Sequence, residues 1–155
     1  MEIRRAQVGD MNGINELLRQ VLEVHHSGRP DIFRSGAKKY TDAELVEIIN
    51  DDTRPIFVMT DGETVVGYAF CVFIQHVGHN ILTDIKTLYI DDLCVLEERR
   101  GEHIGKRIYE YVLAFAKESG CYNLTLNVWA CNESAMKFYE KCGLKPQKVG
   151  MELLI

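Results

Sequence analysis

The chain has 155 residues, of which 46% are hydrophobic and 26% charged, and its formal net charge is −5. This composition is that of an ordinary globular protein and predicts one domain over residues 1–155. No apolar run approaches the ~20 residues that a membrane helix needs, and no signal peptide precedes the first predicted strand. We therefore expect a cytoplasmic protein that binds no membrane and, because it is acidic, no nucleic acid.

The predicted elements alternate between strands and helices, without a linker or an internal repeat. Asp61-Gly62 between two β-rich runs indicates a hairpin, Thr41-Asp-Ala-Glu44 is a capping box, and His25–Asp31 predicts a break. In chain order, the pattern predicts a strand over 2–7, a helix capped by Asp10, a helix to Ile49, strands over 56–60, 65–73 and 85–96, a helix over 103–118, a strand over 124–129 and a helix over 132–142. We expect an α/β protein with a mixed sheet flanked by helices.

The five cysteines are scattered, and no two of them form a C-x-x-C pair. They are therefore expected to be reduced, as in cytosolic proteins. The histidines in predicted loops, His25 and His26 in one and His76 and His79 in another, come without further ligands nearby. No metal site is predicted.

The segment from Tyr89 to Lys106 combines an apolar strand, a glycine-bracketed loop and the start of an amphipathic helix. Unpaired N–H groups and the helix dipole make such a helix start a cradle for phosphate. Gly101 and Gly105 enclose three residues and Lys106 precedes Arg107, so this is no Walker loop. The spacing and the second strand of a dinucleotide fingerprint are also missing.

Two segments resemble the signatures of the GCN5-related N-acetyltransferase (GNAT) family. Arg100-Gly-Glu-His-Ile-Gly105 resembles the pyrophosphate loop of that family, with His103 where a first glycine is usual. Asn127–Leu144 resembles the second signature, in which Asn, Ala, Phe-Tyr-Glu and Gly-Leu recur at this spacing. Ile3–Asp10 is similar to a common opening of the family, so the resemblance covers nearly the whole chain.

The resemblance implies a central mixed, mostly antiparallel sheet with two splayed parallel strands, flanked by about four helices. It also implies acetyl-CoA as co-substrate and no metal. The backbone of the strand before the loop would hold the pantetheine arm, with the Val95 N–H polarising the thioester oxygen. The residues that the resemblance assigns to the cofactor are Leu93, Cys94, Val95, Arg100, Gly101, Glu102, His103, Ile104, Gly105, Lys106 and Asn132.

Tyr139 occupies the tyrosine of the Phe-Tyr-Glu motif, and the resemblance makes it the acid that protonates the leaving thiolate. A phenol of pKa ~10 stays protonated at neutral pH. Asp91 and Asp92 lie mid-strand, one on each face, where a carboxylate must be paired or face a cleft. Asp91 is the predicted base and Asp92 a structural or acceptor-lining partner. A base role for His25 or His79, or an amine that arrives neutral, is left open.

The acceptor is predicted as a primary amine of a small molecule or a peptide. The run Ile90-Asp-Asp-Leu93 resembles that of diamine- and polyamine-acetylating relatives, which favours a small cationic amine. Residues expected to line the acceptor pocket are His25, His26, His79 and Asp92. The alternatives are a non-catalytic acyl-CoA-binding sensor of the same fold and, more remotely, a nucleotide-binding protein. Relatives are often dimers, so a homodimer is expected.

Overall fold

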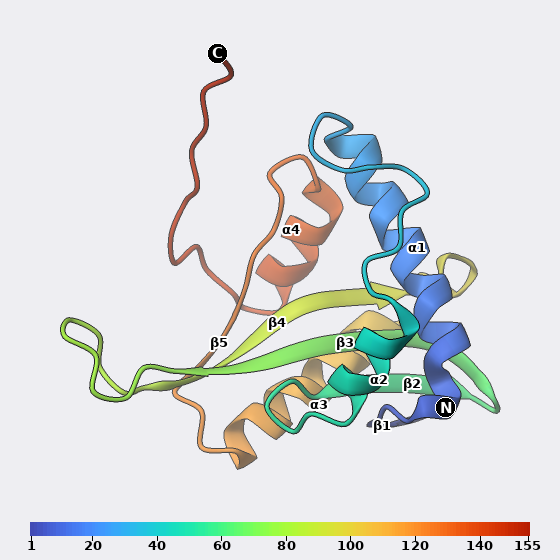
Figure 1. Cartoon of the computed structure of the whole chain (residues 1–155), viewed down its shortest axis with the longest axis horizontal. Helices are drawn as coiled ribbons and strands as arrows, with labels where there is room; N and C mark the ends of the chain where they lie inside the picture. Colours follow the sequence, from blue (N-terminus) through green and yellow to red (C-terminus); the bar gives the residue numbers. More distant parts are fainter.

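A five-stranded mixed sheet forms the centre of the structure, a computed structural model that describes residues 1–155 (Figure 1). Its strands follow one another in chain order across the sheet, and each neighbouring pair is antiparallel except the last, which is parallel. The strands are β1 (Glu2–Arg5), β2 (Ile56–Asp61), β3 (Thr64–Gln75), β4 (Lys86–Val95) and β5 (Asn123–Leu126). The predicted mixed, mostly antiparallel sheet is confirmed.

Four α-helices flank the sheet, as expected: α1 (Met11–Gly28), α2 (Asp42–Ile49), α3 (Ile104–Glu118) and α4 (Glu133–Lys141). The predicted capping box begins α2, because the Thr41 hydroxyl accepts a hydrogen bond from the Glu44 N–H (3.2 Å) and the Glu44 carboxylate accepts one from the Thr41 N–H (2.8 Å). None of the helices combines the length and the apolar character needed to cross a membrane.

Each face of the sheet carries its own hydrophobic core. Helices α1 and α2 cover one face, where Ile14, Leu17 and Leu45 pack with Tyr68 and Phe70 of β3. Helix α3 covers the other face, and its apolar stripe packs against strand residues of β2, β3 and β4. Helix α4 adds one side chain, Phe138, to the edge of this second core and stands where β4 and β5 diverge (Figure 1).

Three expectations on helix and strand ends need correction. Helix α1 does not break at His25 but continues to Gly28, ending where Arg29 precedes Pro30, a step that disfavours helical backbone. Asp10 makes no side-chain cap; its carboxylate instead accepts hydrogen bonds from Arg4 and from the Gln7 N–H. Strand β5 ends at Leu126, three residues before the predicted end.

Candidate active site

The parallel strands β4 and β5 separate in the middle of the fold. They pair over Thr87–Ile90 and Asn123–Leu126, and β4 then continues to Val95 with β3 as its remaining neighbour. One edge of residues 91–95 is therefore open, and α4 stands beside it (Figure 1). Because alternate residues of a strand direct N–H and C=O groups to each side, this edge offers main-chain hydrogen bonds to an extended ligand. The predicted pantetheine residues Leu93, Cys94 and Val95 lie here.

A β-bulge at Asp91 sets which way the two carboxylates face. Phe70 of β3 is opposite Asp92, whereas the next residue, Cys71, is opposite Ile90, so Asp91 is the extra residue. A bulge shifts the alternation of side chains by one. Ile90 thus belongs to the core under α3, while Asp92 and Cys94 face the α1 side of the sheet.

Asp92 is half-buried on the α1 side of the sheet. Its carboxylate accepts a hydrogen bond of 2.7 Å from the Tyr68 hydroxyl. Burial raises the pKa of Asp92 above its ordinary value, while the charge of Lys39 and the Tyr68 hydrogen bond act in the opposite direction. A carboxylate with a raised pKa is a better proton acceptor at neutral pH than an ordinary aspartate.

Asp91 lies at the exposed rim and forms an ion pair of 3.1 Å with the Nζ atom of Lys39. Burial alone would lower the pKa of Lys39, but the charges of Asp92 and Asp91 outweigh it, and the pKa is raised. The two carboxylates therefore already hold one ammonium group. Together with Lys39 they leave one net negative charge at the mouth of the opening.

Three aromatic rings link the end of α1 to the segment after β5. The ring of Phe33 lies between those of His25 (4.9 Å) and Trp129 (5.2 Å), both in edge-on contact. These three residues come from the end of α1, the connection after it, and the segment after β5. Burial lowers the pKa of His25, although the nearby Asp92 charge opposes this effect. The Nδ1 atom of His26 lies 2.7 Å from the Phe33 carbonyl oxygen, which fixes the connection to α1.

Tyr139 lies on α4, whose first turn is capped as predicted by the Asn132 side chain, which accepts a hydrogen bond from the Ala135 N–H (3.1 Å). Burial raises the pKa of the Tyr139 hydroxyl, and the negative charge of Asp92 raises it further. The hydroxyl therefore carries its proton at neutral pH.

The loop between β4 and α3 has the geometry of an anion cradle. The first α3 bond runs from the Arg107 N–H to the His103 carbonyl (3.1 Å), so the N–H groups of residues 104–106 have no helical partner. Gly101 and His103 both have positive φ, 89° and 58°. His103 thus stands in a backbone conformation that glycine adopts without strain. This agrees with the glycine that is usual at this position of the pyrophosphate loop that the segment resembles.

Arg99 fastens this loop to the sheet. Its guanidinium makes two hydrogen bonds to the Glu102 carboxylate (2.8 and 2.9 Å) and one to Asp61 at the end of β2 (3.1 Å). The charge of Glu102 is thereby neutralised beside the cradle. Lys106 pairs with Glu110 at 3.7 Å, and Arg100 is exposed, facing a cleft of about 520 Å³ between the loop and α1.

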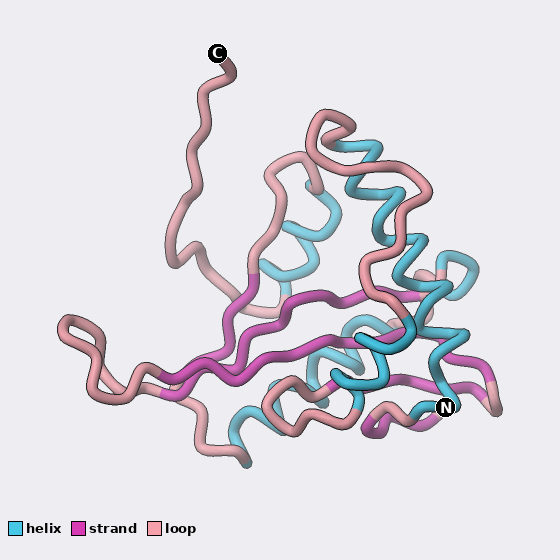
Figure 2. Tube along the Cα trace, viewed as in Figure 1, coloured by secondary structure: helices cyan, strands magenta, loops and turns pink.

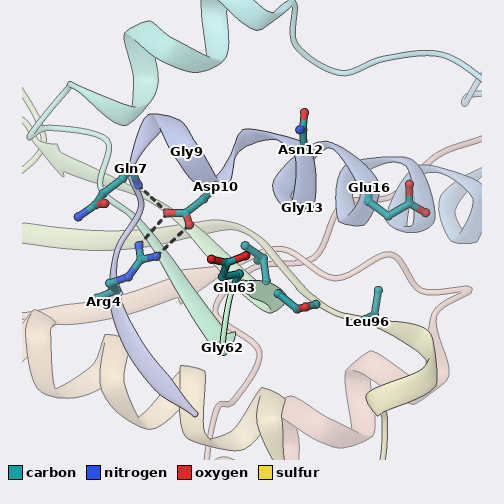
Figure 3. Close-up of a pocket in the computed structure, with 12 residues that line it drawn as sticks. Arg4, Gln7, Gly9, Asp10, Asn12, Gly13, Glu16, Gly62, Glu63 and Leu96 are labelled. Carbon is teal, nitrogen blue, oxygen red and sulfur yellow. Dashed lines mark hydrogen bonds and ion pairs between the residues drawn. The ribbon is translucent and has the colours of Figure 1, made fainter.

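A larger hollow of about 720 Å³ lies outside this site, where α1 begins beside the β2–β3 turn (Figure 3). Its lining is mostly polar. The Asp10 carboxylate accepts two hydrogen bonds from the Arg4 guanidinium (2.7 and 2.9 Å) and one from the Gln7 N–H (2.8 Å). These bonds tie β1 to the start of α1. None of the predicted site residues lines this hollow.

The structure brings most of the predicted residues together but not His79. Its Nδ1 atom accepts hydrogen bonds from the N–H groups of Ile81 and Leu82, in the tip of the β3–β4 connection. This tip projects away from α4 and from the point where β4 and β5 diverge (Figure 1). Conversely, sequence reasoning missed Lys39 and Tyr68, which reach the carboxylates from 52 and 24 positions away along the chain.

A parallel strand pair that separates beside a free helix start is also found in known acetyltransferases. Residues 18–144 match the model of the Acetyltransferase (GNAT) family, and the chain belongs to this family. This confirms both the predicted family and the predicted class of enzyme, an N-acetyltransferase.

Similar proteins act on different amines. Glucosamine 6-phosphate N-acetyltransferase 1 of Dictyostelium discoideum is 28% identical over 144 residues, which cover 92% of this chain and 83% of that protein. Thialysine N-epsilon-acetyltransferase of Bos taurus is 30% identical over 153 residues, covering 91% of this chain and 82% of that protein.

Solved structures show the same fold. A mutant of the BH1408 protein from Bacillus halodurans superposes with a TM-score of 0.95 at 33% identity, over 100% of this chain and 99% of that one. An aminoglycoside N-acetyltransferase in complex with CoA reaches a TM-score of 0.74 at 14% identity, over 99% of this chain and 98% of that one. At this low identity, the likeness to the aminoglycoside N-acetyltransferase shows the fold alone.

Proposed function

We propose that this protein transfers the acetyl group of acetyl-CoA to a primary amine of a small cationic molecule. The observation that carries the proposal is the Asp91–Asp92 pair on β4: Asp91 forms an ion pair with Lys39, the two carboxylates raise the pKa of Lys39, and the charge of Asp92 raises that of Tyr139. A second ammonium group is attracted to the remaining negative charge. The rings of Phe33 and Trp129 offer faces to a cation and to its methylene chain.

Acetyl-CoA supplies an acetyl thioester and leaves as a thiol. The residues present fit it, because the open edge of residues 91–95 offers main-chain hydrogen bonds and the start of α3 offers free N–H groups. Arg100 and Lys106 add positive charge at the cradle. These are the residues that we propose to hold it, together with Asn132 at the start of α4.

Tyr139 holds the proton that the departing sulfur requires. Its raised pKa keeps the hydroxyl protonated at neutral pH, so a proton is present where the sulfur leaves, and the proton that the amine gives up replaces the one that Tyr139 donates. The attacking amine forms the new C–N bond and gives up one proton. Asp91 is the acceptor of this proton that the sequence predicts. Asp92 is a second candidate, because burial raises its pKa and its charge raises the pKa of Tyr139.

We propose that Asp92 accepts the proton of the amine and that Asp91 binds an ammonium group of the substrate. Asp91 already forms an ion pair with the Lys39 ammonium. On this assignment Asp92→Asn lowers kcat by about 10²–10⁴-fold. Asp91→Asn instead raises the KM of a cationic acceptor with a smaller change in kcat. The reverse pattern would return the base role to Asp91, as the sequence predicted.

The test of the function is thiol release from acetyl-CoA with a panel of diamines, polyamines, thialysine, glucosamine 6-phosphate and short peptides. Turnover is expected with diamines and thialysine, and Tyr139→Phe should reduce kcat while calorimetry shows acetyl-CoA binding unchanged. Preference for glucosamine 6-phosphate would overturn the cationic acceptor. Acetyl-CoA binding without any turnover would favour a non-catalytic sensor of the same fold.

A further inference from the structure

The connection between α1 and α2 brings one lysine to the carboxylates of β4. This connection comprises residues 29–41 and returns from the far end of α1 towards the sheet (Figure 2). The Glu23 carboxylate of α1 accepts a hydrogen bond of 2.9 Å from the Ser35 hydroxyl, which fastens the connection to the helix. Near its end lies Lys39, whose Nζ atom is 3.1 Å from the Asp91 carboxylate.

The neighbour of Lys39 anchors this end of the connection on the sheet. The Tyr40 ring stacks on the ring of Phe70 in β3, with the ring centroids 5.8 Å apart and the ring planes 17° apart. The Lys39 Nζ atom lies 5.4 Å from the centroid of the Tyr40 ring. The ammonium group is therefore held beside Asp91, the first residue of the open edge of residues 91–95.

Lys39 differs from other ion-paired lysines in where its amine lies. Lys38 pairs with Asp42 at 2.6 Å, and Lys106 pairs with Glu110 at 3.7 Å, both within one element and its first turn. Lys39 instead carries a primary amine, on four methylene groups, to the carboxylates of β4. It thus has the chemistry of the proposed acceptor and lies where an ammonium group of that acceptor is proposed to bind.

We propose that Lys39 is itself an acetyl acceptor and is acetylated by its own chain when no free amine is bound. This inference rests on the proposed function, because it uses the same donor and the same site. Since the amine is tethered to the site, its local concentration there is about millimolar or higher. A free diamine competes for the same acetyl group, so it should slow the acetylation of Lys39.

The step balances without a further reactant. The Lys39 ammonium first loses one proton to water, and the free amine attacks the carbonyl carbon of the thioester. The C–N bond forms as the C–S bond breaks. Asp92 accepts the proton that the nitrogen gives up, Tyr139 donates its proton to the sulfur, and the proton on Asp92 then restores the Tyr139 hydroxyl. The products are an acetylated lysine side chain and free CoA.

Acetylation changes the charge of the site. An acetylated Lys39 is neutral and no longer forms the ion pair with Asp91. The two carboxylates of β4 are then left for a cationic acceptor. The first acetyl group that an idle chain uses would therefore prepare it to bind diamines more tightly.

The rate of this reaction should rise with pH. Burial lowers the pKa of Lys39, but the charges of Asp92 and Asp91 outweigh this effect and the pKa is raised. Lys39 is therefore an ammonium at neutral pH, and its free amine increases about tenfold for each pH unit below that pKa. The other titratable groups that interact with its charge are His25, Tyr40 and Tyr89.

The test incubates the wild-type chain with acetyl-CoA that carries an isotope-labelled acetyl group, without a free amine, and locates the label by peptide mass spectrometry. Lys38 is the internal control, because its side chain is also ion-paired and is 42% exposed, against 40% for Lys39. Lys39 should gain the label roughly tenfold faster or more. Tyr139→Phe should remove most of this difference. Equal labelling of the two lysines would overturn the proposal, as would a difference that Tyr139→Phe leaves intact.

Diamine turnover in the same preparation separates this inference from the proposed function. Turnover with an unlabelled Lys39 would refute the acetylation of Lys39 alone. A labelled Lys39 without diamine turnover would support it and refute the cationic acceptor instead. The first-order rate of labelling should not change with protein concentration, and a rate that rises with concentration would rule out transfer within one chain.

The change of charge gives the second readout. Preincubation with acetyl-CoA should lower the KM of a diamine roughly fivefold or less, the range of an exposed ion pair. Lys39→Arg is the matched control, because it keeps the positive charge and has no primary amine to acetylate. Its KM should be the same with and without preincubation. An equal fall of KM in Lys39→Arg would show that Lys39 is not the residue responsible.

Discussion

The Tyr68 hydroxyl donates a hydrogen bond of 2.7 Å to the Asp92 carboxylate, from the neighbouring strand of the sheet. Tyr68 is fully buried, and burial together with the negative charge of Asp92 holds its pKa well above the ordinary value. The hydroxyl therefore stays protonated as a donor. Its bond lowers the pKa of Asp92, whereas burial raises it more strongly. These opposing effects set the pH at which Asp92 becomes charged.

Tyr68→Phe should move the acid limb of the pH profile of kcat/KM to higher pH. The phenol hydrogen bond stabilises the charged carboxylate, so its loss raises the pKa of Asp92 further, and the enzyme loses its base at a less acidic pH. Stability should fall by about 1–3 kcal/mol, since a buried acceptor loses its partner. Tyr89→Phe is the control, because the Tyr89 hydroxyl accepts a hydrogen bond from the Asn127 side chain and donates none to Asp92. An unmoved acid limb would mean that the limb does not report Asp92.

Lys39→Met should improve the binding of a cationic acceptor. Lys39 occupies the carboxylate pair with its own ammonium group, and removing it leaves two negative charges for the substrate. The KM of a diamine should fall roughly fivefold or less, the range of an exposed ion pair. In the wild type the Lys39 charge lowers the pKa of Asp92, so this pKa should rise in Lys39→Met. KM is therefore measured at a pH well above the acid limb of both proteins.

The matched control for this change is Lys38→Met, which removes the neighbouring ammonium group and its ion pair with Asp42 (2.6 Å), away from the carboxylate pair. It should leave the KM of the acceptor unchanged. A KM that rises in Lys39→Met would show that Lys39 itself contacts the acceptor, as an anionic group on the substrate would require.

Features encoded by neighbouring residues could be predicted from the sequence. The capping box at Thr41 and the turn at Asp61-Gly62 depend on residues a few positions apart, and both are present. The end of α1 was mispredicted because histidine, serine and glycine weaken a helix without stopping it, whereas the step before Pro30 does stop it.

The arrangement of the site depended on non-local register and could not be predicted. The bulge at Asp91 comes from the pairing of β3 with β4, and it decides that Asp92 turns toward Tyr68. No local pattern contains this information, since one residue of slip exchanges the two faces of a strand. Lys39 likewise reaches the strand from a connection without regular structure.

His103→Gly should stabilise the fold. His103 has a φ of 58°, a left-handed conformation that costs a residue with a Cβ about 1–2 kcal/mol, although histidine tolerates it better than most. Glycine loses more conformational freedom on folding, which offsets about 0.5–1 kcal/mol of this gain in stability. The melting temperature should rise by about 1–4 °C. His103→Ala keeps the Cβ and should show no gain, so equal melting temperatures for the two variants would contradict this reading of the loop.

Asp10→Asn should destabilise the protein by about 2 kcal/mol at pH 7, since hydrogen bonds to a buried charged group contribute about 1.5–3 kcal/mol. The carboxylate is 8% exposed and accepts two hydrogen bonds from Arg4 and one from the Gln7 N–H (Figure 3). The Arg4 hydrogen bond lowers the pKa of Asp10, with burial opposing it. The melting temperature, followed by circular dichroism, should fall by about 4–8 °C.

The pH dependence of this difference distinguishes the ion pair from a packing defect. Because the pKa of Asp10 is lower in the folded than in the unfolded chain, its contribution is complete above the unfolded pKa of about 3.9 and is lost as the pH falls through the folded pKa. The wild type and Asp10→Asn should therefore converge below that range. Glu16→Gln, which removes an exposed ion pair with Arg19, is the matched control and should change the melting temperature by less than about 2 °C. A gap between wild type and Asp10→Asn that persists in strong acid would assign the loss to packing and not to the carboxylate charge.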